Sequence, residues 1–400
     1  MPPAVGDNHS MDRDASIAIV GAGICGLTAA LALARFGFRR IAVYERSPVL
    51  GEVGAGLTLS PNATRALIGL GIGDALARAC DEPYTGVTRH WRNADILTRS
   101  ERGAAIRKRY GAPYFQIHRA DLLDLLAQAV ARQPTVELRT DHALVGLETR
   151  GERTALRFAN GASASADVVL GCDGLKSVVC RELFGEIPAQ FSGYVAWRGL
   201  VPAESLAQPL DPPAQLFIGV DRMFMRYLVR HGALVNVVAV ARSAGWTDEG
   251  WMIPSTIEEL RAQYEGWYAD IVDAIDHLPP SQCFKWAIHV REALPRWHDG
   301  HVVLAGDAAH PMVPFMGMGA AMGIEDGVVL ARALATHNSP SVALEAFERA
   351  RHERATFVQR ESAQRDVRLM SKDPDSFGRS LEVSEDSLGL FAYDVYGIAV

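Results

Sequence analysis

The sequence predicts an α/β fold, in which a Rossmann-like dinucleotide-binding domain carries an inserted β-sheet domain and a C-terminal helix. Glycine-rich turns follow apolar, strand-like runs in two distant segments, Ile17–Arg46 and His301–Leu330. Further apolar runs of strand length lie between these segments. The 400 residues are enough to build two hydrophobic cores.

The first glycine-rich turn has the spacing of a dinucleotide-binding motif. Ser16–Val20 is a short apolar run typical of a buried parallel strand, and Leu27–Phe36 has the Ala and Leu content of a helix. Between them, Gly21, Gly23 and Gly26 allow a tight turn, a close approach of backbone to a pyrophosphate, and close packing of helix on strand. The N–H groups at the start of such a helix bind phosphates.

A second strand and an acidic residue complete this motif. Arg40–Tyr44 forms the strand and Glu45 follows it, close to the roughly 20-residue spacing of an acid that binds a ribose hydroxyl. A carboxylate here disfavours a 2′-phosphate, so this half of the sequence predicts FAD or NAD. The alternative, glycines that serve only packing, does not explain strand, helix, strand and acid in this order.

The second glycine-rich turn favours FAD. We expect His301–Leu304 to be a strand ending at Gly306 and Asp307, after which prolines and glycines prevent regular structure until a helix near Ala320. The Asp307 carboxylate can accept hydrogen bonds from ribityl hydroxyls, although a turn or capping role is its alternative. The helix N-terminus can face the flavin pyrimidine edge, where reduction places negative charge. A nicotinamide dehydrogenase has no obvious use for this arrangement.

With two further segments, the chain resembles the aromatic-ring hydroxylases, the single-component (class A) flavoprotein monooxygenases. Within them it is most similar to the salicylate hydroxylase and 6-hydroxynicotinate 3-monooxygenase branch. The resemblance covers nearly the whole chain and implies the GR2-type fold of p-hydroxybenzoate hydroxylase. The segments that carry it are GAGICG, GEVGAGLTLSPNATRAL (Gly51–Leu67), HRADL (His118–Leu122), GCDGLKS (Gly171–Ser177), YVAWRG (Tyr194–Gly199) and GDAAHPMVPFMGMGAAMGIEDG (Gly306–Gly327).

The resemblance implies a set of cofactor-binding residues. These are Gly21, Gly23, Gly26, Glu45 and Arg46 for the ADP half, Arg119 for the diphosphate or ribityl region, Asp307 for the ribityl chain, and Pro314, Gly317, Gly319 and Ala320 for the pyrimidine edge. Asp173 corresponds to an aspartate that the family links to FAD and NAD(P)H handling. We expect its direct role to be holding its own loop.

The family reaction is the hydroxylation of a phenol or aromatic acid. NADH or NADPH reduces the flavin, O₂ adds to form a C4a-hydroperoxide, and an electron-rich ring takes its distal oxygen, in salicylate hydroxylation with decarboxylation. Alternatives on the same cofactor are hydroxylation of a hydroxypyridine-type ring, epoxidation or N-hydroxylation. A remote alternative is a flavin-less binding protein, as the Rab GDP-dissociation inhibitors are, but the intact cofactor motifs argue against it.

The predicted substrate sheet contains the candidate catalytic residue. Phe217–Tyr227 and Leu234–Ala241 have strand-like apolar patterns. Tyr227 aligns with a tyrosine that binds substrate or deprotonates a phenol in the 6-hydroxynicotinate and 3-hydroxybenzoate enzymes. Its alternative is a packed strand tyrosine. We expect the neighbouring Arg226 and His231 to point to solvent.

Three positions where relatives carry histidine hold other residues in this chain. They are Thr58, Met223 and Phe315, and Met316 follows the last of them. One interpretation is ordinary core packing. The other is a more apolar substrate pocket, for a ring that is larger or less charged than 6-hydroxynicotinate.

Motif positions predict the domain boundaries. The cofactor domain comprises 14–85, 105–185 and 285–335, the substrate domain 86–104 and 186–284, the C-terminal helix 336–372, and the tail 373–400. We expect a flanking helix at Thr256–His277, and a long helix that begins after Ser339 with Pro340 in its first turn.

Composition excludes several other classes of function. The 40 basic and 47 acidic residues give a net charge of −7, which leaves no basic footprint for nucleic acid. The five cysteines have no CxxC or metal-ligand spacing, so we expect reduced thiols and no metal. Residues 1–15 have no apolar signal region, and no span suits a membrane. We therefore expect a cytoplasmic monomer or homodimer.

Overall fold

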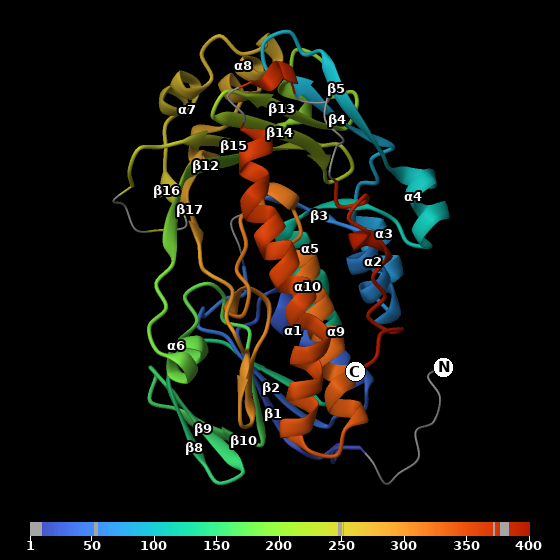
Figure 1. Cartoon of the computed structure of the whole chain (residues 1–400), viewed down its shortest axis with the longest axis vertical. Helices are drawn as coiled ribbons and strands as arrows, with labels where there is room; N and C mark the ends of the chain where they lie inside the picture. The colour runs from blue at the N-terminus through green and yellow to red at the C-terminus, as the bar shows by residue number, and fades with distance from the viewer. Residues whose placement is uncertain (1–9, 52–54, 247–249, 251, 371–372, 377–383) are drawn as a thin grey trace.

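The computed structural model describes residues 10–51, 55–246, 250, 252–370, 373–376 and 384–400. Two β-sheets lie at opposite ends of an elongated molecule, and the long helix α10 (Pro340–Leu369) runs from one toward the other (Figure 1). The expectations for the first residues of the chain fall mostly on 1–9, which lie outside the described residues, as do 52–54 of the Gly51–Leu67 segment.

A six-stranded sheet forms the core of the lower half of Figure 1. Its central strand β1 pairs in parallel with β2 on one side and β11 on the other. The strand order is β18 (His298–Asp299), β19 (Val302–Leu304), β11 (Val168–Gly171), β1 (Ser16–Val20), β2 (Arg40–Tyr44) and β7 (Val136–Arg139). Because β1, β11 and β19 are parallel, the glycine-rich turns that follow β1 and β19 lie at the same edge of the sheet. Ligands bind at this edge, the carboxyl ends of the strands, in such folds.

Helix α1 (Ile24–Arg35) follows the first glycine-rich turn and packs between α5 (Arg119–Ala131) and α9 (Gly319–Thr336). Gly327 lets α9 approach α1 closely, because a Cβ atom at this position would lie 2.8 Å from the Ala29 backbone nitrogen. The predicted start of α9 near Ala320 is confirmed to within one residue.

An eight-stranded sheet forms the other end of the molecule. Its order is β16 (Ile253–Pro254), β17 (Phe284–Val290), β12 (Gln190–Pro202), β15 (Leu234–Arg242), β14 (Arg222–Val229), β13 (Ala214–Gly219), β4 (Thr85–His90) and β5 (Ile96–Glu101). Alternate residues of each strand face opposite sides. On β12, Trp197 packs toward α7 and α8, whereas Tyr194 and Ala196 belong to a second cluster that includes Phe315 of the distal glycine-rich segment.

One expectation about the flank of the sheet was wrong. The expected helix Thr256–His277 is two helices, α7 (Ile257–Gln263) and α8 (Ala269–Asp276). Gly266 at φ +76° breaks the helix, and the Tyr264 hydroxyl, buried between the two helices, donates to the Met223 and Val240 carbonyl oxygens.

The strand-like segment Phe217–Tyr227 lies in this sheet as a hairpin. β13 and β14 pair within it in antiparallel register, and its turn has Asp221 at φ +55°. Asp residues tolerate this left-handed conformation better than most residues do.

The remaining elements are short. They are the ribbon β3 (Gly56–Leu59) with β6 (Phe115–His118), the sheet β8 (Leu144–Arg150), β9 (Arg153–Phe158) and β10 (Ser163–Ala166), and the helices α2 (Pro61–Gly69), α3 (Gly73–Ala79), α4 (Gly103–Tyr110) and α6 (Val178–Phe184). None of the helices in the described part of the chain combines the length and apolar composition needed to cross a bilayer. The division into domains at the ranges given above stays a proposal.

Candidate functional site

The first glycine-rich turn is shaped by two glycines that touch backbone and one that does not. Gly21 has φ +100°, and a Cβ atom on it would lie 2.4 Å from the Cys172 carbonyl oxygen. A Cβ on Gly26 would lie 2.0 Å from the Gly21 carbonyl oxygen. A Cβ on Gly23, in contrast, would have no atom within 4 Å. This open space at the start of α1 fits a pyrophosphate, which helix N-termini bind.

Glu45 lies at the end of β2, next to the same turn. Its carboxylate accepts the Ala22 N–H at 2.8 Å and the Ser47 N–H at 2.9 Å. The neighbouring Arg46 is exposed. The structure therefore brings Glu45 to the glycine-rich turn, where an acid that binds ribose belongs.

Asp173 is occupied by its own loop. Its carboxylate accepts the Ser177 hydroxyl and the backbone N–H groups of Val178 and Val179, the latter two at 2.7 and 3.1 Å. Burial raises the pKa of Asp173 above its usual value, and these hydrogen bonds oppose that rise. These contacts fit the expected role of holding the loop that abuts Gly21.

The second glycine-rich turn presents Asp307 to solvent. Gly306 has φ +60° and is buried, whereas the Asp307 side chain between it and the buried Ala308 is exposed. The turn at Pro314–Met316 ends at Gly317, with φ +63°, immediately before α9 begins at Gly319. Pro314 and Gly317 are exposed, and Gly319 and Ala320 are half-buried. Arg119, the first residue of α5, donates its backbone N–H to the Ala55 carbonyl oxygen at 2.9 Å.

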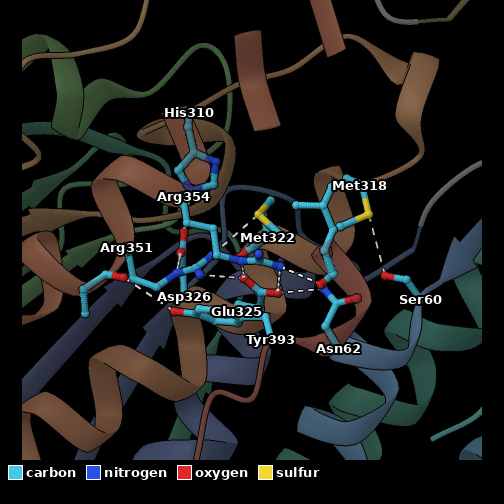
Figure 2. Close-up of polar contacts among 12 residues, drawn as sticks. Ser60, Asn62, His310, Met318, Met322, Glu325, Asp326, Arg351, Arg354 and Tyr393 are labelled. Carbon is cyan, nitrogen blue, oxygen red and sulfur yellow. Dashed lines mark hydrogen bonds and ion pairs between the residues drawn. The ribbon is translucent and has the colours of Figure 1, made fainter. Parts of the chain in front are cut away.

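A buried ionic network holds the second turn from behind (Figure 2). The Asp326 carboxylate on α9 accepts the Gly306 N–H at 2.8 Å and pairs with His310 Nε2 at 2.6 Å. Arg351 on α10 donates its Nε–H to the other Asp326 oxygen at 2.8 Å. Asp326 thus joins the flavin-side turn to α10.

The neighbouring Glu325 extends this network to two other parts of the chain. It pairs with Arg351 at 2.5 Å, and with Arg354 through two hydrogen bonds of 2.9 Å. Asn62 of α2 donates its amide N–H to Glu325 at 2.6 Å. Arg354 lies 3.9 Å from the ring centre of Tyr393 in the C-terminal tail.

The charges of the network balance, because Glu325 and Asp326 face Arg351 and Arg354. Burial disfavours ionisation of Asp326, but His310 and Arg351 outweigh it and hold its pKa well below the usual value. Burial likewise opposes the charge of Arg351, and the two carboxylates reverse that effect and raise its pKa. Asp326 and Arg351 therefore hold each other in their charged forms.

The inner face of the eight-stranded sheet lies toward the second turn. Met223 of β14 and Phe315 are both buried in one apolar cluster with Trp286 and Tyr194. The Phe315 and Tyr194 rings meet edge to face at 5.7 Å. Two of the expected pocket residues are thereby brought together.

The other two expected pocket residues lie on the cofactor side. Met316 is buried in the core around the six-stranded sheet, so for this residue the core-packing interpretation fits better. The Thr58 hydroxyl of β3 lies 3.4 Å from the Gly317 carbonyl oxygen. Thr58 therefore connects β3 to the flavin-side turn.

Tyr227 reaches from the sheet down to β3. A Cβ atom on Gly56 would lie 2.6 Å from the Tyr227 ring and 2.8 Å from its hydroxyl oxygen, so only glycine fits at position 56. Among the described residues no hydrogen bond to the hydroxyl is found, and Tyr114 is the one group besides burial that acts on its charge. Burial raises the pKa of Tyr227 well above its usual value. In the free protein this residue is a neutral hydrogen-bond donor and not a base.

Arg226, which we expected in solvent, is buried on the opposite face of the sheet. Its guanidinium donates to Gln215 Oε1 at 2.8 Å and to Asp270 Oδ2 at 3.2 Å. Successive side chains of a strand point to opposite faces, so Arg226 faces the side of β14 opposite to Tyr227. That side is covered by the rest of the domain and not by solvent, which is why the expectation was wrong. His231 is exposed, as expected.

Sequence reasoning missed the ionic network. The pair Glu325–Asp326 within an otherwise apolar helical segment was a signal, because buried acids need partners. Their partners Arg351 and Arg354 carried no such signal. The cysteines are free, with Cys25 and Cys172 sulfur atoms 3.8 Å apart beside the first turn. Among the described residues no cluster of metal ligands occurs.

Comparison with known proteins supports this site. Residues 14–362 match the family model described as FAD binding domain. The chain is 40% identical over 364 residues to 3-amino-4-hydroxybenzoate 2-monooxygenase of Streptomyces platensis, covering 89% of each chain. It is 35% identical over 396 residues to 6-hydroxynicotinate 3-monooxygenase of Pseudomonas fluorescens, covering 97% of each.

Among solved structures, the chain is similar to Klebsiella pneumoniae HpxO in complex with FAD and uric acid. The TM-score is 0.83 at 25% identity, and the match covers 95% of this chain and 97% of HpxO. The predicted fold class, family resemblance and FAD cofactor are thereby confirmed. The individual cofactor and substrate contacts remain predictions.

From the ionic network we predict that substitutions of two arginines of α10 differ greatly in their effect on the free energy of unfolding. Arg351→Met leaves Asp326 and Glu325 with an unbalanced buried charge, and we expect the free energy of unfolding to fall by about 3–5 kcal/mol. Arg349→Met removes only a surface pair with Glu345 on the same helix and should change it by less than about 0.5 kcal/mol. Urea denaturation followed by circular dichroism measures both, and equal losses would contradict the prediction.

We predict that substitution of Asp307 weakens FAD binding. Its side chain is exposed at a turn that the network fixes, so Asp307→Ala should leave the fold intact and raise the dissociation constant for FAD about tenfold or more, through loss of charge-assisted hydrogen bonds. Flavin fluorescence during reconstitution of the apoprotein measures this constant. Asp299→Ala, in the exposed part of β18, is the control. An unchanged constant in Asp307→Ala would remove this residue from the cofactor site.

Proposed function

The chain belongs to the FAD binding domain family of class A flavin hydroxylases, and we propose that it hydroxylates a phenolic aromatic acid with electrons from NADH or NADPH. O₂ is the proposed oxidant. FAD, when bound, transfers electrons from the nicotinamide to O₂ and delivers one oxygen atom to the ring. The protein must then bind the ring, orient it and exclude water.

One observation carries this proposal. Met223 and Trp286 on the inner face of the eight-stranded sheet form an apolar wall together with Phe315 of the turn that leads into α9, and Tyr227 adds one neutral phenol on the same face of the sheet. An apolar wall with few polar groups is typical of a small-molecule site. Aromatic side chains also suit an aromatic ligand, because rings pack favourably edge to face.

The side chains of this wall supply hydrogen bonds and packing more readily than proton transfer. Thr58, Met223 and Phe315 have no group that ionises near neutral pH. Burial raises the pKa of the Tyr227 phenol, which keeps its proton in the free protein. The substrate therefore reaches this face as an anion, or loses its phenol proton to a group outside these residues.

The relatives support an oxygenated aromatic acid as substrate. One is named for 3-amino-4-hydroxybenzoate and another for 6-hydroxynicotinate, and both compounds are hydroxylated ring carboxylates. The benzoate-type substrate is favoured because the wall is apolar where the resemblance implies histidines. A hydroxypyridine remains the second candidate, since the 6-hydroxynicotinate enzyme matches 97% of this chain.

A substrate panel tests this function. We expect 3-amino-4-hydroxybenzoate, 4-hydroxybenzoate, salicylate or a close analogue to accelerate NADH or NADPH oxidation by the FAD-loaded protein at least tenfold over the substrate-free rate. The product should gain one oxygen atom by mass. Release of CO₂ would identify the decarboxylating version, and acceleration by 6-hydroxynicotinate alone would favour the second candidate. If no aromatic compound stimulates oxidation, the proposal is wrong.

Tyr227 is expected to orient the ring. Tyr227→Phe removes the hydroxyl and keeps the ring that packs on Gly56, so we expect intact folding and FAD content with a higher fraction of NAD(P)H consumed as H₂O₂. The ratio of product to NAD(P)H, with peroxide assayed separately, measures this. Tyr268→Phe, in the loop before α8, is the matched control. Wild-type coupling in Tyr227→Phe would exclude the role.

A further inference from the structure

Asn236 on β15 is fully buried and has one unused polar atom. Its side-chain oxygen Oδ1 accepts the Gly56 N–H at 2.6 Å, which ties β15 to the start of β3. Its amide nitrogen Nδ2, with two N–H groups, has no hydrogen-bond partner among the described residues. Because a buried donor without a partner costs free energy, such groups in native proteins commonly serve a ligand or an ordered water.

The Tyr227 hydroxyl lies beside this amide. Tyr227 and Asn236 are direct partners in the antiparallel register of β14 and β15, so their side chains share the inner face. The Tyr227 hydroxyl oxygen and the Asn236 Cγ atom each lie 2.8 Å from the point where a Gly56 Cβ would be. Two unused donors from neighbouring strands therefore converge above Gly56.

Apolar side chains pack around these donors on this part of the face. They are Leu200, Val229, Ala214, Met225 and Leu234. Since Asn236 Nδ2 has no acceptor among the described residues, an acceptor on a bound ligand would complete its hydrogen bonding. Oxygen atoms of carboxylates and phenolates are strong acceptors and carry the charge that two donors stabilise.

We propose that Asn236 is a specificity-determining residue, whose amide N–H groups act with the Tyr227 hydroxyl to bind an anionic oxygen of the aromatic substrate. This rests on the proposed function, because it identifies the substrate group read at the same site. Asn236 also positions β3 through Gly56, and the two roles use different atoms. The oxygen belongs to either a carboxylate or a phenolate.

Asn236→Asp separates the two roles. The new carboxylate keeps an oxygen to accept the Gly56 N–H, but it replaces the two donors with an acceptor that repels a substrate anion. We expect FAD content near that of the wild type, and a thermal stability that is lower at pH 8.5 than at pH 6.5, because the introduced carboxylate is buried without a cation. The dissociation constant of the substrate should rise at least tenfold at pH 8.5, with a smaller rise at pH 6.5, where more of the introduced carboxyl is protonated.

Isothermal titration of the FAD-loaded protein with benzoate, phenol, 4-hydroxybenzoate and toluene identifies the oxygen. Weaker binding of benzoate but not phenol assigns a carboxylate, and the reverse assigns a phenolate. Asn160→Asp, the same substitution at an exposed position in the turn between β9 and β10, is the control and should bind as the wild type does.

Three outcomes would overturn the inference. They are unchanged affinities in Asn236→Asp at both pH values, an equal loss for toluene, which has no oxygen, and a loss of FAD that accounts for the weaker binding. If the wild-type protein itself bound none of the aromatic acids and showed no stimulated NAD(P)H oxidation, the proposed function would be wrong, independently of the result for Asn236. Wild-type turnover with an unaffected Asn236→Asp variant would refute only the role of Asn236.

Discussion

The hydrogen bond from the Gly306 N–H to the Asp326 carboxylate fixes the turn on which the site depends. It holds Gly306 in a left-handed conformation and leaves the adjacent Asp307 side chain exposed toward the cofactor edge of the sheet. The buried carboxylate can make this bond as an anion because His310 and, from α10, Arg351 stabilise its charge. The flavin-side turn is therefore positioned by a helix that belongs to neither glycine-rich motif.

The same network connects parts of the chain that are distant in sequence. Glu325 binds Asn62 of α2 as well as Arg351 and Arg354, and Arg354 stacks on Tyr393 of the tail. Because Glu325, Asn62 and Arg351 are buried, removing any one of them leaves a buried partner with an unsatisfied polar group. The arrangement makes α2, α9, α10 and the tail a single support for the site (Figure 2).

The eight-stranded sheet, which carries the candidate substrate residues, is held on β3 by close packing and not by an ion pair. Gly56 on β3 leaves room for the Tyr227 ring and the Asn236 amide, so the eight-stranded sheet rests directly on the ribbon that also contacts the flavin-side turn through Thr58. The resulting face is apolar with a few hydrogen-bond donors. Such a face can orient an anionic ring and exclude water, but it contains little that could move a proton.

The fold class, the two glycine-rich turns and the cofactor could be predicted from the sequence, because the motifs that indicate them, and that carry the family resemblance, are residues at short spacings within single segments. Gly21, Gly23 and Gly26 are identified by the two short intervals between them, and Asp307 by its place just after an apolar strand-like run. The sequence did not reveal helix breaks that depend on packing. The single helix expected at Thr256–His277 is two shorter helices, because Tyr264 is buried between them.

Which side chains lie in contact could be established only from the folded chain. Asn236 faces Gly56 across 180 residues, and Asn62 meets Glu325 across 263. Local propensity and periodicity extend over a few turns or strands and carry no information on such pairs. Burial in a shared core then decides whether a polar atom has a partner, and so which residues are left to bind a ligand.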